Sequence, residues 1–405
     1  MADEDLLYKL WLNITCGHNP SLIDKCRRLC GSAEEIYNSD AAYKKLLSAL
    51  DIRTRLKTRR SLDKARQLAE YCEQSGISII TAEDKKYPKR LAQIYNPPRI
   101  LYVKGELPDI DNLVCITIAG KRDCSEYSKK FAARLSYDLA KAGILIVSGM
   151  AKGIDASAHS AALKAGHQTV ALLAGGVDVV YPKENAGLYD KIIKNGAVIS
   201  ERPPGTAGRG TFYKERNRIM VGLSCGTVIV EGDLHSGTKL SAAWAIESNR
   251  DLFAVPGKPD DKGAELPNSL IKDSAKLITS AEDIVEEYIG AYPIELSNGL
   301  KMLSDTSANE LPYESAETNI KHKNNGYSEK IKKNLVRKKP DFEKFDDKQR
   351  IILEYLYNNN EAVHIDDISR DCNIPTTELS FLIIQLMMAR AVKEHAGDYY
   401  SISAE

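Results

Sequence analysis

Between residues 113 and 278, short apolar runs alternate with longer amphipathic stretches. The apolar runs predict strands at 114–118, 144–147, 169–173, 198–200, 227–230 and 252–255. The stretches between them predict helices at 127–142, 156–165, 184–195, 214–223 and 239–248. This alternation predicts an α/β fold in which helices cover both faces of a parallel sheet. Ligands bind such sheets beyond the carboxyl ends of the strands, so a site is expected in the turns that follow them.

The N-terminal part of the chain has a different pattern. From 1 to 80, apolar residues recur at helical spacing, as at Leu6, Leu10 and Trp11, which predicts a small helical domain. The α/β domain is then expected to occupy 81–289.

The C-terminal part changes pattern twice. Residues 290–340 are polar and rich in Asn and Lys, which predicts a flexible linker. Order returns over 341–405, where the pattern predicts helices at 348–357, 365–372 and 376–389 and a strand at 397–401. Three helices with a β-ribbon predict a winged helix, a fold that binds either DNA or protein.

Composition narrows the class of protein. The 56 basic and 56 acidic residues balance, which argues against coating of DNA by bulk charge but leaves room for a local basic groove. Basic residues cluster at 53–60 and 321–339. No apolar run is long enough to span a bilayer, and the acidic start lacks the layout of a signal peptide. The eight cysteines are scattered, which predicts free thiols in a reducing cytoplasm.

The densest motif is SGMAKGID, which begins at Ser148 directly after an apolar run. A strand that enters a glycine-bearing turn and then a helix points its backbone N–H groups in one direction, which favours binding of an anion such as phosphate. Ser148, Gly149, Lys152 and Gly153 are the candidate contacts in this turn. Asp155, in the first turn of the helix, suits either a capping role or a ligand contact.

Further candidates follow the other predicted strands. Arg122 could hold a phosphate with its forked guanidinium, and two arginines flank an asparagine where the helix at 214–223 begins. For each, the alternative is an ordinary turn or a helix with surface ion pairs. The candidates are Gly120, Lys121, Arg122, Gly175, Arg216, Asn217, Arg218, Glu231, Ser236, Gly237, Thr238 and Lys239.

Several anion-binding turns along one sheet edge fit a polyanion better than a single nucleotide. The sequence has no GxGxxG motif and no P-loop motif, which argues against a dinucleotide enzyme. It also has no metal triad and no paired carboxylates, so neither a metal nor a cofactor is expected.

These motifs, in this order, resemble the DNA-processing protein A (DprA/Smf) family of bacterial natural transformation. The resemblance covers roughly half of the chain, from about 84 to 278. It includes DKKYP at 84–88, GKR at 120–122, SGMAKGID at 148–155 with His159, RNRI at 216–219, VEGDLHSGT at 230–238 and AVPG at 254–257.

The resemblance implies an extended Rossmann-like fold that forms a homodimer and binds single-stranded DNA. It implies protection of incoming strands, displacement of single-strand-binding protein and loading of the RecA recombinase, without catalysis. It also implies an N-terminal domain of the sterile-alpha or helix-hairpin-helix kind and a C-terminal winged helix. The implied DNA groove uses Arg122, the turn at 148–153, the RNR residues and the turn at 236–238.

The chain departs from the family pattern in places. Lys121 stands where the family usually has Ser or Thr, and Tyr213 stands where it usually has proline. Lys121 and Lys239 therefore add two candidate phosphate contacts. If bases stack on this edge, Phe212 and Tyr213 are the rings expected to receive them.

Two other functions remain open at this point. A nucleotide-hydrolysing enzyme of the phosphoribohydrolase kind could use His159 and Glu231 as an acid–base pair, although a packed, hydrogen-bonded histidine is the better interpretation. The predicted winged helix could read duplex DNA. Its last helix, at 376–389, has few basic residues, which favours contact with protein instead.

Overall fold

The computed structural model describes residues 3–292, residue 296 and, with short gaps, 345–402. The described chain divides into two compact units, one holding the residues up to Val285 and the other holding residues 286–292 together with the residues from 345 onward. The predicted linker at 290–340, with its basic stretch at 321–339, lies almost wholly outside the described residues.

The first unit begins with short helices held by local caps. Asn19 accepts a hydrogen bond from the Leu22 amide, and Ser32 and Glu35 form a reciprocal capping box. Apolar side chains such as Leu10 and Leu46 are fully buried in the core of these helices. The helices are α1 (Glu4–Thr15), α2 (Pro20–Cys30), α3 (Ala33–Asn38), α4 (Asp40–Ala49), α5 (Ile52–Lys57) and α6 (Asp63–Gln74).

A nine-stranded sheet follows within the described residues, in the order β1-β2-β6-β5-β4-β3-β7-β8-β9. Its strands are β1 (Ile77–Thr81), β2 (Ile100–Gly105), β3 (Cys115–Gly120), β4 (Leu145–Ser148), β5 (Thr169–Leu172), β6 (Gly196–Ser200), β7 (Gly226–Glu231), β8 (Asp251–Ala254) and β9 (Lys276–Leu277). Strands β3 to β9 pair in parallel, which confirms the predicted parallel sheet. The sequence reading missed β1, β2 and β9, and the first two add an antiparallel edge beside β6.

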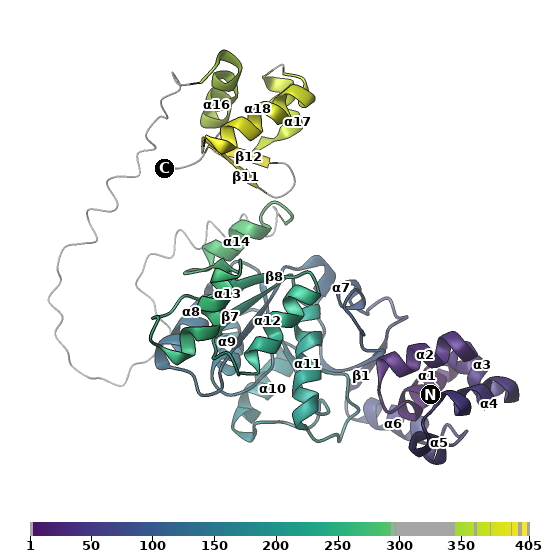
Figure 1. Ribbon diagram of the computed structural model, residues 1–405. Coiled ribbons are helices and arrows are strands. Elements are labelled where there is room, and N and C mark those ends of the chain that lie inside the picture. The colour runs from purple at the N-terminus through teal and green to yellow at the C-terminus, as the bar shows by residue number, and fades with distance from the viewer. Residues whose placement is uncertain are drawn as a thin grey trace, which may run out of the picture. The chain divides into compact units, whose positions relative to one another are not determined.

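Helices lie on both faces of this sheet (Figure 1). One face packs against α11 and α12, through side chains such as Ile219 and Ala242, and the other against α9 and α10. The helices after β1 are α7 (Lys89–Ala92), α8 (Glu126–Lys141), α9 (Ile154–Lys164), α10 (Ala186–Lys194), α11 (Gly210–Gly222), α12 (Thr238–Glu247), α13 (Glu265–Lys272) and α14 (Glu282–Tyr288).

Helix α11 begins at Gly210, four residues before the predicted start at Lys214. This difference corrects the expectation that the RNR residues stand at a helix start. Phe212 and Tyr213 occupy the first turn instead, and Arg216 lies within the helix.

The second unit consists of helices and a small antiparallel sheet. Its described helices are α16 (Asp347–Asn358), α17 (Ile365–Asp371) and α18 (Thr376–Met388), within one residue of the predicted ranges. Strands β10 (Val363–His364), β11 (Val392–His395) and β12 (Tyr399–Ile402) pair in the order β10-β12-β11. Ile352, Leu379 and Leu386 are buried between the helices. The winged-helix assignment stays a prediction.

None of the helices described over 3–292 and 345–402 combines the length and apolar character needed to cross a membrane.

Candidate nucleic-acid interface

The predicted turns gather at the carboxyl edge of the parallel strands. Strand order reverses at β3, which has β4 on one side and β7 on the other. This reversal is the place where open α/β sheets bind ligands. The neighbouring strand ends are tied together, because the Lys121 amide donates to the Glu231 carbonyl at 3.1 Å and the Ser148 hydroxyl donates to the Ile118 carbonyl at 2.7 Å.

The turns after β3 and β4 touch each other through their backbones. Gly153 has a φ of +78°, and a Cβ there would lie 2.3 Å from the Arg122 carbonyl oxygen. A Cβ at Gly120 would lie 2.5 Å from the Ile154 side chain, where α9 begins. Glycine is therefore required at both positions, and the two turns form one continuous surface.

Arg216 lies directly under the turn that follows β4. Its Nη1 donates to the Leu172 carbonyl at 2.8 Å, and a Cβ at Gly149 would stand 1.5 Å from the same nitrogen. The missing side chain of Gly149 thus makes room for a buried guanidinium. Burial lowers the pKa of Arg216, and the nearby Asp155 carboxylate opposes that shift. The structure thus places Arg216, one of the three RNR residues, against the SGMAKGID turn.

Asp155 is buried and faces the turn. Its Oδ2 accepts a hydrogen bond from the Ala151 amide at 3.3 Å, and burial raises the pKa of its carboxyl group. Asn185 donates to the Met150 carbonyl at 2.8 Å from the other side. Asp155 therefore holds the turn in shape, which is the capping role rather than ligand contact.

An exposed cation–aromatic cluster forms the rim of the edge. The guanidinium carbon of Arg122 lies 5.1 Å from the centre of the Tyr213 ring, and the Tyr213 and Tyr181 rings are 6.1 Å apart. Tyr181 is 55% exposed. Sequence reasoning named Arg122 and Tyr213 but missed Tyr181 as a ring of this site, because only the fold brings the residue before Pro182 beside α11.

Phe212 differs from Tyr213 in what covers its ring. The Arg202 guanidinium lies 4.2 Å from the centre of the Phe212 ring, and the Arg209 guanidinium lies 5.9 Å from it. Guanidinium groups therefore contact both the Phe212 ring and the Tyr213 ring, and Tyr181 is the most exposed of the three rings.

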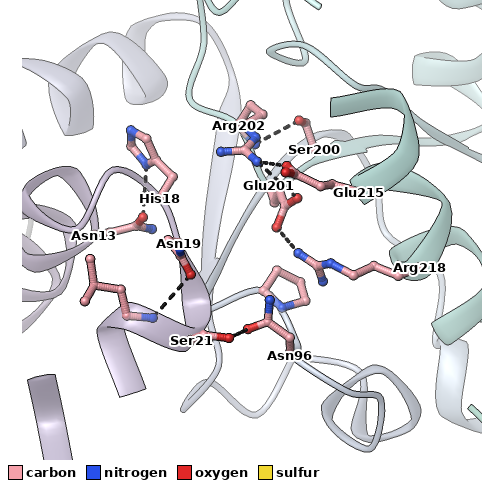
Figure 2. A network of polar contacts seen from close by, with 12 residues as sticks. Asn13, His18, Asn19, Ser21, Asn96, Ser200, Glu201, Arg202, Glu215 and Arg218 are labelled. Carbon is pink, nitrogen blue, oxygen red and sulfur yellow. Dashed lines mark hydrogen bonds and ion pairs between the residues drawn. The ribbon is translucent and has the colours of Figure 1, made fainter. Parts of the chain in front are cut away.

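A second polar cluster lies at the end of β6, near the turn between α1 and α2 (Figure 2). Arg218 forms a buried ion pair with Glu201, and Arg202 pairs with Glu215. His18, in the turn between α1 and α2, lies near Arg202, and burial together with that positive charge lowers the pKa of His18 to about 4.

The second cluster corrects the expectation for two RNR residues. Arg218 is 5% exposed and faces Glu201, because two residues further along α11 turns its side chain by about 200° from that of Arg216. Asn217 donates to the Ser241 hydroxyl oxygen at 3.1 Å, which joins α11 to α12. Neither residue is brought to the edge with Arg122.

The β7 end holds the remaining acidic candidate. Glu231 Oε2 accepts hydrogen bonds from the Ser125 amide at 2.9 Å and from the Ser125 hydroxyl at 2.7 Å, where α8 begins. This carboxylate therefore orders the turn after β3. The sequence predicted a ligand contact at Glu231, and the structure instead gives it this structural role.

The turn at 236–238 lies beside the turn after β3. Ser236 donates its hydroxyl to the Asp233 carbonyl at 2.8 Å, and Lys121 pairs with the Asp233 carboxylate at 3.4 Å. Gly237 has no atom near its missing Cβ, Thr238 is buried, and Lys239 is exposed. The exposed lysine remains a candidate contact, whereas the Ser236 hydroxyl is already engaged.

The last two candidates support loops. A Cβ at Gly175 would lie 2.6 Å from the Thr206 carbonyl, so this glycine lets the loop before α11 pack on the strand ends. Lys152 is exposed and pairs with Glu184 at 2.9 Å.

The geometry disfavours the acid–base pair of the enzyme hypothesis. His159 is fully buried, and its Nδ1 lies 2.7 Å from the Thr169 hydroxyl, which itself donates to the Ile146 carbonyl. Nδ1 therefore donates to Thr169, and burial lowers the pKa of His159 to about 3. His159 is a packed histidine, and Glu231 is bound to the start of α8. No group of His, Cys, Asp and Glu in the described parts of the chain could hold a metal ion.

Comparison with known proteins gives matches over the same region. A family described as DNA recombination-mediator protein A matches residues 54–289. DNA processing protein DprA of Bacillus subtilis is 41% identical over 222 residues, which cover 55% of this chain and 74% of that protein. DNA processing protein DprA of Streptococcus pneumoniae is 37% identical over 227 residues, covering 56% and 79%. The X-ray structure of DprA from Streptococcus pneumoniae has a TM-score of 0.57 at 29% identity and covers 69% of this chain and 97% of that one.

Proposed function

The chain belongs to the DNA recombination-mediator protein A family, and we propose that it binds single-stranded DNA along the carboxyl edge of its parallel sheet. Phosphates would contact Arg122 and the backbone amides of the turn at 148–153. Bases would stack on Tyr181 and Tyr213, since stacking on aromatic side chains accepts any base.

One observation carries this proposal. Arg216 is buried beneath Gly149, while Arg122 is exposed on the rim, so one positive charge lies under the turn and another lies at its surface. The Asp155 carboxyl group interacts with Arg216, and burial raises its pKa. Lys121 and Lys152 are paired with Asp233 and Glu184, whereas Arg122 forms no ion pair with a carboxylate of the described residues. An exposed, unpaired guanidinium supports local recognition of phosphate without any excess of charge in the whole chain.

The cellular role follows from membership in the family. We propose that the protein acts in the cytoplasm as a homodimer during natural transformation, protects incoming single strands, and loads the RecA recombinase while displacing single-strand-binding protein. It acts by binding, without catalysis or cofactor.

Fluorescence anisotropy of a labelled oligo-dT strand, measured across salt concentrations, tests the DNA-binding proposal. Affinity should fall with salt, with a slope of roughly 0.7 per phosphate contacted. Binding that does not depend on salt would contradict a phosphate-lined edge.

The mediator role needs a separate assay. RecA filament formation on single strands coated with single-strand-binding protein should accelerate when the chain is added. If the chain binds DNA but does not accelerate RecA filament formation, the proposed DNA interface stands and the proposed RecA-loading role is wrong.

A further inference from the structure

The helix α5, in the N-terminal region, carries a surface that the DNA interface does not use. None of its six residues, Ile52–Lys57, is buried. Ile52 and Leu56 are each 70% exposed, the highest fractions among the large apolar side chains of the described residues. A helix this short gains little stability on its own, so aliphatic side chains turned outward indicate contact with another molecule.

The same segment is strongly basic. Residues 41–60 contain seven basic side chains and one acidic side chain, whereas the whole chain has 56 of each. Arg60 pairs with Asp40, and Arg59 folds back to donate to the Leu56 carbonyl at 3.0 Å. The remaining charges on α5 belong to Arg53, Arg55 and Lys57, none of which pairs with a carboxylate elsewhere in 3–292 or 345–402.

Helical geometry arranges these residues into a ridge with two charged flanks. Successive residues turn by about 100°, so Ile52 and Leu56 lie within about 40° of each other. Arg53 and Lys57 fall on one side of that aliphatic pair, and Arg55 falls on the other.

We propose that α5 binds an acidic amphipathic segment of a partner protein. The aliphatic pair would pack against apolar side chains of the segment, and the flanking guanidinium and ammonium groups would pair with its carboxylates. This binding is independent of the DNA interface on the sheet edge.

Nucleic acid fits this surface less well. Tyr43, the aromatic residue between 41 and 60, has its ring beside the Arg60 guanidinium and the Trp11 ring, so it offers no stacking face to a base. Phosphates would leave the aliphatic ridge without a partner, since they are hydrated anions.

The test is anisotropy of a labelled synthetic helical peptide of about 16 residues, with leucines at every third and fourth position and acidic residues elsewhere. The full chain should bind this peptide, and added salt should weaken binding. The double substitution Ile52→Ser with Leu56→Ser should weaken binding at least tenfold, and charge reversal at Arg53, Arg55 and Lys57 should abolish it.

Two controls separate the contributions. Ile246→Ser removes a similarly exposed aliphatic side chain from α12 and should leave peptide affinity unchanged. A second peptide with serine in place of each leucine should bind at least tenfold more weakly than the first. Oligo-dT affinity of every variant should match that of the unaltered chain, which verifies folding.

Three results would overturn the proposal. The first is absence of binding by the leucine peptide. The second is equal binding of the serine peptide, which would reduce the surface to charge alone. The third is tighter binding of a DNA duplex that competes with the peptide at α5, which would make the surface a nucleic-acid site.

Discussion

Two arginine clusters each include one residue of α11, Arg216 in the first and Arg218 in the second, and they differ in how their charge is balanced. Near the turn after β4, Arg216 interacts with the buried Asp155 carboxyl group, and the exposed Arg122 forms no ion pair with a carboxylate of the described residues. At the end of β6, Arg202 and Arg218 face two carboxylates, Glu201 and Glu215. The first cluster keeps a net positive charge for a ligand, whereas the second is neutral and holds the fold together. Basic residues in a sequence therefore mark an anion site only where acidic partners are too few.

The largest difference between the clusters should appear in stability. Glu201→Ala leaves the buried Arg218 without its carboxylate, which should lower the free energy of unfolding by about 3–5 kcal/mol. Urea unfolding measures this loss. Glu184→Ala, which removes an exposed carboxylate paired with Lys152, should change the free energy of unfolding far less, because water screens the pair. Equal costs would show that burial does not distinguish the two pairs.

The next effect concerns DNA affinity. Gly149→Ala places a methyl group where Arg216 lies, so the guanidinium must move and oligo-dT affinity should fall about tenfold, or about 1.4 kcal/mol. Gly187→Ala is the matched control, because nothing lies within 4 Å of its added Cβ. If Gly149→Ala leaves oligo-dT affinity unchanged, the buried Arg216 does not contribute to DNA binding.

A smaller loss is expected at the rim. Arg122→Ala should weaken oligo-dT binding about fivefold and reduce the salt slope by roughly 0.7, because one phosphate contact is lost. The loss should be the same for strands of different sequence. Arg134→Ala, exposed on α8, serves as the control. A loss confined to one base would contradict a phosphate contact.

The smallest expected effect is a pH dependence of stability, which arises from His18 beside the second cluster. The pKa of His18 is lowered to about 4 by burial and by the charge of Arg202. Between pH 6.5 and 4, the His18 imidazole is therefore protonated in the unfolded chain but neutral in the folded chain. Stability therefore falls as pH drops from 6.5 toward 4. His18→Asn, which tolerates the residue's positive φ, should reduce the loss between pH 7.5 and 5.5 by about 0.5–1 kcal/mol. Identical pH profiles from thermal unfolding would rule out this contribution.

The sequence predicted the parallel strands β3 to β8 because each is a short apolar run that ends in a turn. It did not predict β2 as a strand beside β6, since this antiparallel pairing joins Tyr102 to Ser200, far apart in the chain. Local pattern does not specify such partners.

At the site, sequence motifs predicted the glycine turns and the exposed Arg122. They did not predict that Arg216 and Arg218 point to different partners. Their directions depend on the helix phase and on the position of Glu201, which comes from a neighbouring strand end. Glu231 was also misassigned as a contact, because its bond to Ser125 depends on how β3 and β7 align.

The outer strand β1 and the N-terminal helices together protect one edge of the sheet. Strand β1 covers β2, and the helices share one continuous apolar core with the sheet through residues such as Tyr102 and Val198. A shortened chain that begins after Thr81 would leave β2 as a bare sheet edge made largely of apolar residues. Unpaired edges of this kind recruit strands from other chains, so such a fragment should aggregate rather than survive as a smaller DNA-binding protein.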